Sequence, residues 1–136
     1  MTRETILGVI VTLLAVVLYL GLAMRVGILR GMLDIKAPAT TGHPQFERAY
    51  RVHLNTAEQY IAFLPLFWMA TLTFHAYYWL PAVLGIAFLL ARLFYMRLYM
   101  AAPDRRIAGA FLTMFSQIGL LSLSIIGVVQ IGRQYW

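Results

Sequence analysis

The sequence contains no cysteine, and only 12% of its 136 residues are charged. Without cysteine, the chain has no disulfide, no thiolate zinc site and no thiol nucleophile of its own. Acids are the scarcest charged class, with 5 Asp and Glu against 11 Lys and Arg, so the net charge is +6. Because the chain also has only three histidines, we expect no metal site.

Apolar residues make up 62% of the chain, and the mean hydropathy is +0.77. This composition is too apolar for a single soluble core, so lipid is the expected solvent. None of the apolar runs alternates with a period of two, which excludes barrel strands and leaves helices as the spanning form. We therefore predict one all-α membrane domain over residues 1–136, a bundle of four transmembrane helices at about 5–30, 46–75, 81–100 and 107–132.

The second predicted helix is unusually long. Extended back to Phe46, it would measure about 43 Å at about 1.5 Å per residue, against a hydrocarbon core of about 30 Å. Its first turns should therefore project toward water.

Basic residues predict the orientation of the bundle. Nine of them lie beside the first and third connections: Arg25, Arg30, Lys36, Arg48, Arg51, Arg92, Arg97, Arg105 and Arg106. Positive residues favour the cytoplasmic side, so these connections should be cytoplasmic and both termini should face away from the cytoplasm. Because the basic residues are not spread over a water-facing surface, no nucleic-acid partner is expected.

Polar residues also occur inside the helices, at helical spacing. Arg48, Arg51, Asn55 and Glu58 follow one another at intervals of three, four and three, which places them on one stripe. Arg92 lies within an apolar run, where a lipid-facing arginine costs roughly 2.5 to 3.5 kcal/mol. We therefore expect Arg92 to point inward to a partner.

Two interpretations of these cations remain open. In the first they form structural ion pairs, Glu47 with Arg51 and Glu58 with Arg92, while other arginines extend to the membrane surface. In the second an anion completes the site, because nine cations meet few acids: Asp34, Glu47, Glu58 and Asp104. Anionic lipid headgroups suit the outer cations, which are Arg25, Lys36 and Arg97. A small zwitterionic peptide suits the inner set, because arginine forks bind carboxylates while Asn55 and Glu58 can bind an ammonium group.

Three segments resemble a known family. Residues 46–58 read FERAYRVHLNTAE, which resembles the E-R-x-x-R-x-x-x-N-x-x-E signature of the MAPEG family, the membrane-associated proteins in eicosanoid and glutathione metabolism. Residues 38–44 (PATTGHP) resemble the loop before that signature, and residues 91–99 (ARLFYMRLY) resemble the family's third-helix motif. The resemblance, which is to the leukotriene synthase and microsomal glutathione transferase branch, covers nearly the whole chain.

The resemblance implies a homotrimer with glutathione bound between neighbouring subunits near the cytoplasmic face. It implies glutathione contacts from one subunit, supported by Arg92, through five residues: Arg51, Asn55, Glu58, Tyr95 and Tyr99. Arg30 and His53 would approach from the neighbour. Arg106 falls where the family has a thiol-activating arginine, and Arg105 is the alternative if the loop register shifts by one. Gln59 departs from the pattern, since the family has a tyrosine there that Tyr60 could replace.

The resulting functional hypothesis is a membrane-bound glutathione transferase in the bacterial inner membrane or the endoplasmic reticulum. A thiolate held by Arg106 would attack an apolar electrophile, with reduction of lipid hydroperoxides as a further activity. The alternatives are a non-catalytic lipid-binding or scaffold protein of the same family and an eicosanoid-synthase-like isomerase. A channel is disfavoured because the central parts of the first and last helices are almost wholly apolar.

Overall fold

The computed structural model describes residues 1–102, 104 and 106–135. It contains four helices, α1 (Arg3–Met32), α2 (Pro44–Thr73), α3 (Leu80–Ala101) and α4 (Arg106–Tyr135). Each helix boundary lies within three residues of the one expected from the apolar runs. The all-helical class and the number of helices are therefore confirmed.

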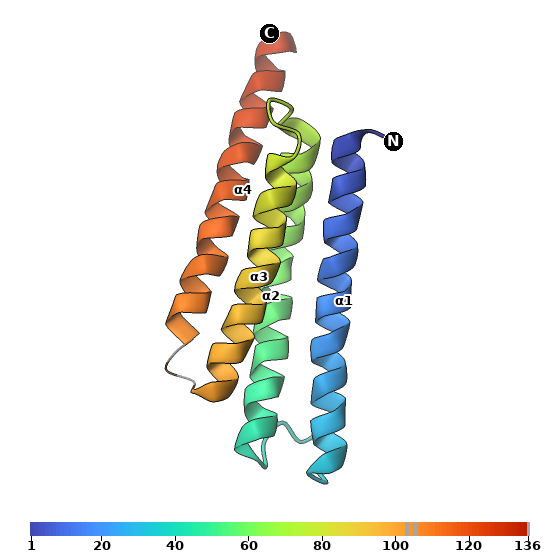
Figure 1. Cartoon of the computed structure of the whole chain (residues 1–136), viewed down its shortest axis with the longest axis vertical. Coiled ribbons are helices and arrows are strands. Elements are labelled where there is room, and N and C mark those ends of the chain that lie inside the picture. The colour runs from blue at the N-terminus through green and yellow to red at the C-terminus, as the bar shows by residue number, and fades with distance from the viewer. Residues whose placement is uncertain (103, 105, 136) are drawn as a thin grey trace.

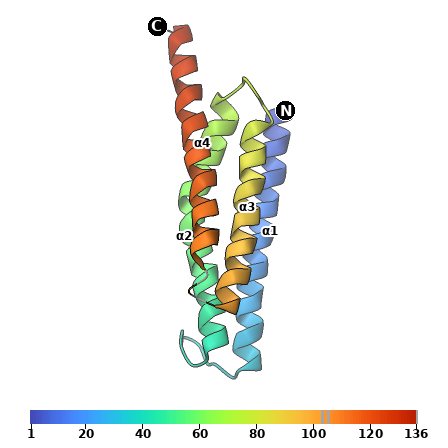
Figure 2. The same cartoon turned by 60° about the vertical axis from the view of Figure 1, so that its left-hand side comes forward.

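The helices run up and down in chain order, nearly parallel to one long axis (Figure 1). Both termini lie at the same end as the α2–α3 connection, and the two basic connections share the opposite end. At that basic end the α1–α2 hairpin extends beyond the α3–α4 connection (Figures 1 and 2). The first turns of α2 thus project past the ends of α3 and α4, as the length of the helix predicted.

Local sequence signals define the start of α2. His43 is the N-cap residue, and its Nδ1 accepts a hydrogen bond from the backbone N–H of Gln45 at 3.2 Å. Pro44 follows at the first helical position, where its missing N–H costs nothing. Glu47 accepts a hydrogen bond from the backbone N–H of Gly42 at 3.0 Å. These contacts hold the first turn of α2, which leads directly into the polar stripe.

The core is built largely from phenylalanine. Phe63, Phe67 and Phe88 have no exposed surface, and the rings of Phe63 and Phe88 stack with centroids 3.8 Å apart. Val11 and Leu120 join the same cluster from α1 and α4. This cluster fixes the middle of all four helices, so the polar residues on either side of it have a rigid support.

Helices α2 and α4 run parallel and are joined by two side-chain hydrogen bonds. Gln117 Nε2 donates to the carbonyl of Gln59 at 3.2 Å, and Ser124 Oγ donates to the carbonyl of Leu66 at 3.1 Å. Both bonds join residues 58 positions apart, and they repeat after seven residues. The register of α4 on α2 is therefore constant over two turns, with polar side chains of α4 satisfied inside the bundle.

Within the described part of the chain, three helices are long and apolar enough to cross a membrane, namely α1, α3 and the segment Arg106–Arg133 of α4. The fourth, α2, has 30 residues, as many as α1, but carries Glu47, Arg48, Arg51 and Glu58 in its first half, which lowers its hydropathy. The outer faces of the apolar helices are rich in exposed hydrophobic side chains, such as Val17 and Phe115. The chain is therefore a multi-pass integral membrane protein.

Candidate functional site

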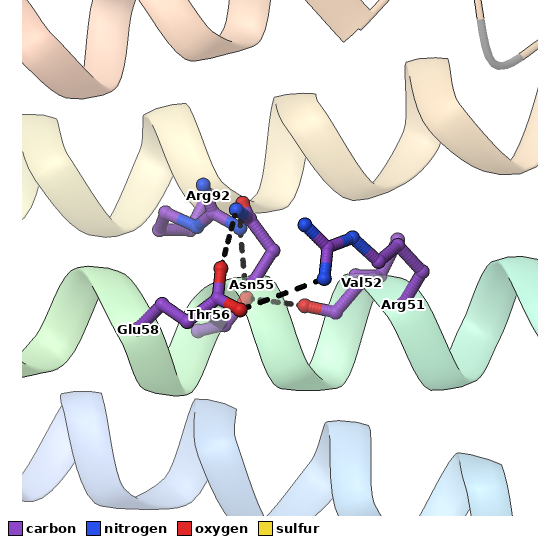
Figure 3. Close-up of polar contacts among 6 residues, drawn as sticks. All are labelled: Arg51, Val52, Asn55, Thr56, Glu58 and Arg92. Atoms are coloured by element: carbon purple, nitrogen blue, oxygen red, sulfur yellow. Dashed lines mark hydrogen bonds and ion pairs between the residues drawn. The ribbon is translucent and has the colours of Figure 1, made fainter.

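Arg92 of α3 is buried, with 2% of its surface exposed, and points between the helices rather than toward lipid. Its Nη2 atom donates hydrogen bonds to Asn55 Oδ1 at 3.0 Å and to Thr56 Oγ1 at 2.9 Å (Figure 3). Its guanidinium carbon lies 4.3 Å from the ring centroid of Tyr95, a cation–π distance. The inward orientation is as the sequence predicted, but the partners are neutral groups.

The polar stripe of α2 forms a short network of its own. Arg51 Nη1 lies 3.5 Å from Glu58 Oε1, and Asn55 Nδ2 donates to Glu58 Oε2 at 3.2 Å (Figure 3). The expected pairs of Glu47 with Arg51 and of Glu58 with Arg92 are therefore wrong. Arg51 reaches two turns along its own helix to Glu58, and Glu47 is bonded to Gly42 instead.

A cavity of about 610 Å³ lies between α2, α3 and α4. Its polar lining combines three guanidinium groups, three side-chain amides, a phenol and a hydroxyl: Arg51, Arg92, Arg106, Asn55, Gln59, Gln117, Tyr95 and Thr113. Its apolar lining comes from α4 and includes Ile107, Phe111 and Met114, whose exposed fractions are 60%, 63% and 51%. The volume is in the range of ordinary small-molecule pockets.

Tyr95, Tyr99 and Arg106 are stacked beside this cavity. The rings of Tyr95 and Tyr99 lie 5.6 Å apart at 24°, and the Arg106 guanidinium lies 5.9 Å from the Tyr99 centroid. Gly109 lets α4 approach α3 here, because a Cβ atom on it would come within 2.6 Å of the Tyr95 Cα. The first turn of α4 thus carries Arg106 to the cavity. Arg105, the alternative thiol-activating residue, lies outside the described residues.

Arg30 and His53 lie elsewhere in the chain. Arg30 Nη1 donates to the carbonyls of Ile35 at 3.3 Å and Ala39 at 2.9 Å, so within one chain it holds the first connection. His53 stacks on Tyr19 of α1 at 4.7 Å, and its Nε2 is buried without a hydrogen-bond partner among the described residues. Neither residue lines the cavity.

The sequence did not predict Thr56, which supports Arg92, or six of the cavity residues. These six are Ile107, Ala110, Phe111, Thr113, Met114 and Gln117. Thr56 supports Arg92 and is fully buried, and its hydroxyl also donates to the carbonyl of Val52 at 2.8 Å. The sequence feature that could have identified Thr56 is its hydroxyl next to Asn55, on a helix face otherwise occupied by the apolar residues Val52 and Phe63. The cavity residues of α4 gave no signal, because most of them are ordinary apolar side chains. The polar residue Gln117 was an isolated exception in an apolar helix.

Gln59 departs from the family pattern at a position that lines the cavity. The family pattern has a tyrosine at this position. Tyr60 does not replace it, because its hydroxyl donates to the carbonyl of Ala15 on α1 at 2.8 Å. The tyrosines nearest the cavity are therefore those of α3.

The charges in the site do not cancel. The cavity lining holds three arginines, and among the described residues the one carboxylate bonded to this group belongs to Glu58. Three positive charges and one negative charge leave the site with a net +2. A ligand of opposite charge would remove this excess.

Comparison with known proteins agrees with the motifs. The model of the MAPEG family matches residues 8–126. An uncharacterized protein of Synechocystis sp. is 35% identical over 135 residues, which cover 98% of this chain and 97% of that protein. Leukotriene C4 synthase of Bos taurus is 33% identical over 129 residues (95% and 85%), and microsomal glutathione S-transferase 2 of Mus musculus is 36% identical over 106 residues (78% and 71%). The chain therefore belongs to the MAPEG family and is a membrane protein related to glutathione transferases.

Proposed function

We propose that the protein is a membrane-bound glutathione transferase that joins the glutathione thiolate to apolar electrophiles. The net charge of the cavity is the observation that carries this proposal. Glutathione as a thiolate has two carboxylates, one ammonium group and one sulfur anion, a net charge of −2. This charge matches the +2 of Arg51, Arg92, Arg106 and Glu58.

The polar side chains can divide the work of binding. Arg51 has a planar fork suited to a carboxylate of glutathione, and Glu58 presents a carboxylate suited to its ammonium group. Asn55 donates to Glu58 at 3.2 Å and so holds that carboxylate in place. Arg92 orients Asn55 from the neighbouring helix α3, through the 3.0 Å hydrogen bond. Tyr95 and Tyr99 supply an aromatic wall and hydroxyl groups on the α3 side.

Arg106 is the proposed catalytic residue. A free cysteine thiol has a pKa near 8.5, so at neutral pH most of it is protonated and a poor nucleophile. A guanidinium beside the sulfur favours the thiolate and lowers the pKa of the glutathione thiol. Arginine suits this role better than lysine, because it keeps its charge in a partly desolvated site.

The electrophile would reach the sulfur from the bilayer. Ile107, Phe111 and Met114 line the cavity and also have large exposed surfaces on α4, so an apolar molecule can pass from lipid along this side. The thiolate then forms a carbon–sulfur bond while the leaving group departs with the electron pair. Product and leaving group can separate, one toward water and the other toward lipid.

The assembly and orientation belong to the same proposal. We propose a homotrimer in which Arg30 and His53 complete the glutathione site of a neighbouring subunit, since both lie off the cavity of their own chain. The basic end would face the cytoplasm, in a bacterial inner membrane or the endoplasmic reticulum. Glutathione would then enter from the compartment where it is made.

Arg106→Ala tests the catalytic assignment. Purified protein is titrated with glutathione by calorimetry, and the thiolate is followed by its ultraviolet absorbance at pH 7. We expect binding to persist while the thiolate signal falls about tenfold or more, as the thiol pKa returns toward its ordinary value. Arg133→Ala, at the far end of the same helix, is the matched control, and Arg106→Lys should retain part of the signal. An unchanged thiolate signal in Arg106→Ala would remove Arg106 from this role.

The reaction class is tested in parallel assays. Wild-type protein with glutathione is given a chloronitrobenzene, which measures conjugation, and a lipid hydroperoxide, which measures reduction. The proposal expects conjugation, with or without reduction. Glutathione binding without turnover of either substrate would favour a non-catalytic protein, and absence of glutathione binding would overturn the proposal as a whole.

A further inference from the structure

The guanidinium group of Arg25 on α1 has few hydrogen-bond acceptors around it. It is half-buried, and its Nη1 donates to the thioether sulfur of Met96 on α3 at 3.8 Å. A thioether is a weak acceptor, and a guanidinium has five N–H donors to satisfy. Among the described residues, Met96 is the only hydrogen-bond partner of the Arg25 side chain, and no carboxylate lies within ion-pair distance of it.

Arg97 directly follows Met96 and is exposed, without an ion pair to any described carboxylate. We call Arg25, Met96 and Arg97 the basic patch. The patch lies near the basic end of the bundle, where α1 meets α3. It is separate from the cavity, which is lined by α2, α3 and α4 without these three residues.

Exposed apolar side chains continue from the patch toward the middle of the membrane. Leu93 and Leu90 precede Arg97 by one and two turns on the same face of α3, and their exposed fractions are 38% and 60%. On α1, Met24 and Ile28 flank Arg25 and are 65% and 53% exposed. The surface thus has two cations, Arg25 and Arg97, at the end expected to lie near the membrane–water interface. The apolar residues of α3 that precede Arg97 can contact an acyl chain.

The two glutamates of α2 at this end are bonded to other groups. Glu58 is bonded to Arg51 and Asn55, and Glu47 accepts from the backbone of Gly42. Arg48 shows the contrast, because it donates to the carbonyl of Met100 at 3.1 Å, in the last turn of α3, where cations are favourable. Among the described residues, neither Arg25 nor Arg97 makes a comparable bond to the end of a helix.

We propose that the basic patch is a binding site for the headgroup of an anionic phospholipid. The phosphate lies between the guanidinium groups of Arg25 and Arg97 and accepts their N–H donors, while one acyl chain follows Leu93 and Leu90. The site is distinct from the glutathione site and does not depend on the activity of the protein.

The test compares two lipids on the whole purified protein. Detergent micelles containing equal amounts of phosphatidylglycerol and phosphatidylcholine are used, and retained lipid is counted by native mass spectrometry. Wild-type protein should favour phosphatidylglycerol. Arg25→Gln and Arg97→Gln should each lower this preference by roughly fivefold, since one basic residue near an anionic surface contributes about 1 kcal/mol. The double variant should show no preference.

Matched variants separate this site from a general effect of charge. Arg3→Gln with Arg133→Gln removes the same charge at the opposite end and should leave the preference unchanged, and Arg25→Lys with Arg97→Lys should keep most of it. Excess inorganic phosphate should not displace the lipid. Three results would overturn the proposal: a wild-type preference in the Gln double variant, an equal loss in the opposite-end control, or displacement by phosphate, which would indicate a site for the soluble anion. Glutathione titration of the same variants reports separately on the cavity.

Discussion

Arg92 shows how one side chain can be unfavourable for stability and useful for a site. Removing a guanidinium from water costs several kcal/mol, and the partners of Arg92 are an amide, a hydroxyl and an aromatic ring rather than a carboxylate. Its Nε is buried without a partner among the described residues. What Arg92 provides is the fixed position of Asn55, whose oxygen it holds while the amide nitrogen faces Glu58.

Arg92→Met should therefore separate stability from binding. Methionine has similar length and no charge, so we expect an unchanged or higher thermal midpoint in detergent. Glutathione affinity should fall about tenfold, because Asn55 loses its orienting bond and the site loses one of its three positive charges, a combined effect of about 1.4 kcal/mol. The midpoint is measured by thermal unfolding and the affinity by calorimetry.

Thr56→Val is the graded comparison for that variant. It keeps the shape of the side chain and removes one of the two acceptors of Arg92, so its effect on glutathione affinity should be smaller. Unchanged affinity in Arg92→Met would show that Asn55 keeps its position without Arg92, and the positioning role would have to be abandoned.

The close contact of α3 with α4 depends on a glycine. Gly109 lies one turn after Arg106, and a Cβ atom there would meet backbone atoms of Tyr95, with its Cα at 2.6 Å and its N at 2.9 Å. Backbone atoms cannot rotate away as the end of a flexible side chain can. The close approach thus couples the start of α4 to the tyrosines of α3.

Gly109→Ala should push the two helices apart at the cavity. We expect a loss of about 1 to 3 kcal/mol in stability, the usual cost of overpacking, and a weaker thiolate signal as Arg106 moves away from its place beside Tyr99. Gly27→Ala is the control, since nothing lies within 4 Å of its added Cβ and helix propensity alone should make it neutral or stabilising. Equal behaviour of the two variants would show that the close approach is relaxed in the membrane.

On the scale of the molecule, the candidate residues divide between two sides of the bundle. The cavity residues belong to α2, α3 and α4, whereas His53 faces Tyr19 of α1 and Arg30 holds the first connection. A site that used both groups would have to be shared between chains, with one subunit supplying each part.

Co-expression of two inactive variants tests this sharing. Arg51→Ala and Arg30→Ala should each weaken glutathione binding alone. In mixed trimers, sites that take Arg51 from one chain and Arg30 from the other would be intact, about a quarter of the total by random assembly. Calorimetry on the whole purified population, homotrimers included, should show this fraction of tight sites. If mixing the chains restores nothing, each site is contained in one chain or Arg30 has only its structural role.

The sequence by itself determined the class of the fold, the helix boundaries and the inward orientation of Arg92. These features depend on single residues or single helices: apolar runs of membrane length, proline and N-cap positions, and the high cost of a charge in lipid. The motifs likewise predicted the family, which the comparisons confirmed. The roles assigned to the glutathione residues stay predictions.

Only the tertiary structure decided which groups meet. Glu58 pairs with Arg51 instead of Arg92, and Tyr60 turns to α1 while Gln59 takes the cavity wall. Such choices depend on the rotation and register of packed helices, which the Gln117 and Ser124 bonds and the close approach at Gly109 fix. Spacing along a helix gives the face on which a residue lies. Its partner on a neighbouring helix depends on how the two helices are placed, to within a few ångströms, and the sequence of one helix does not specify that placement.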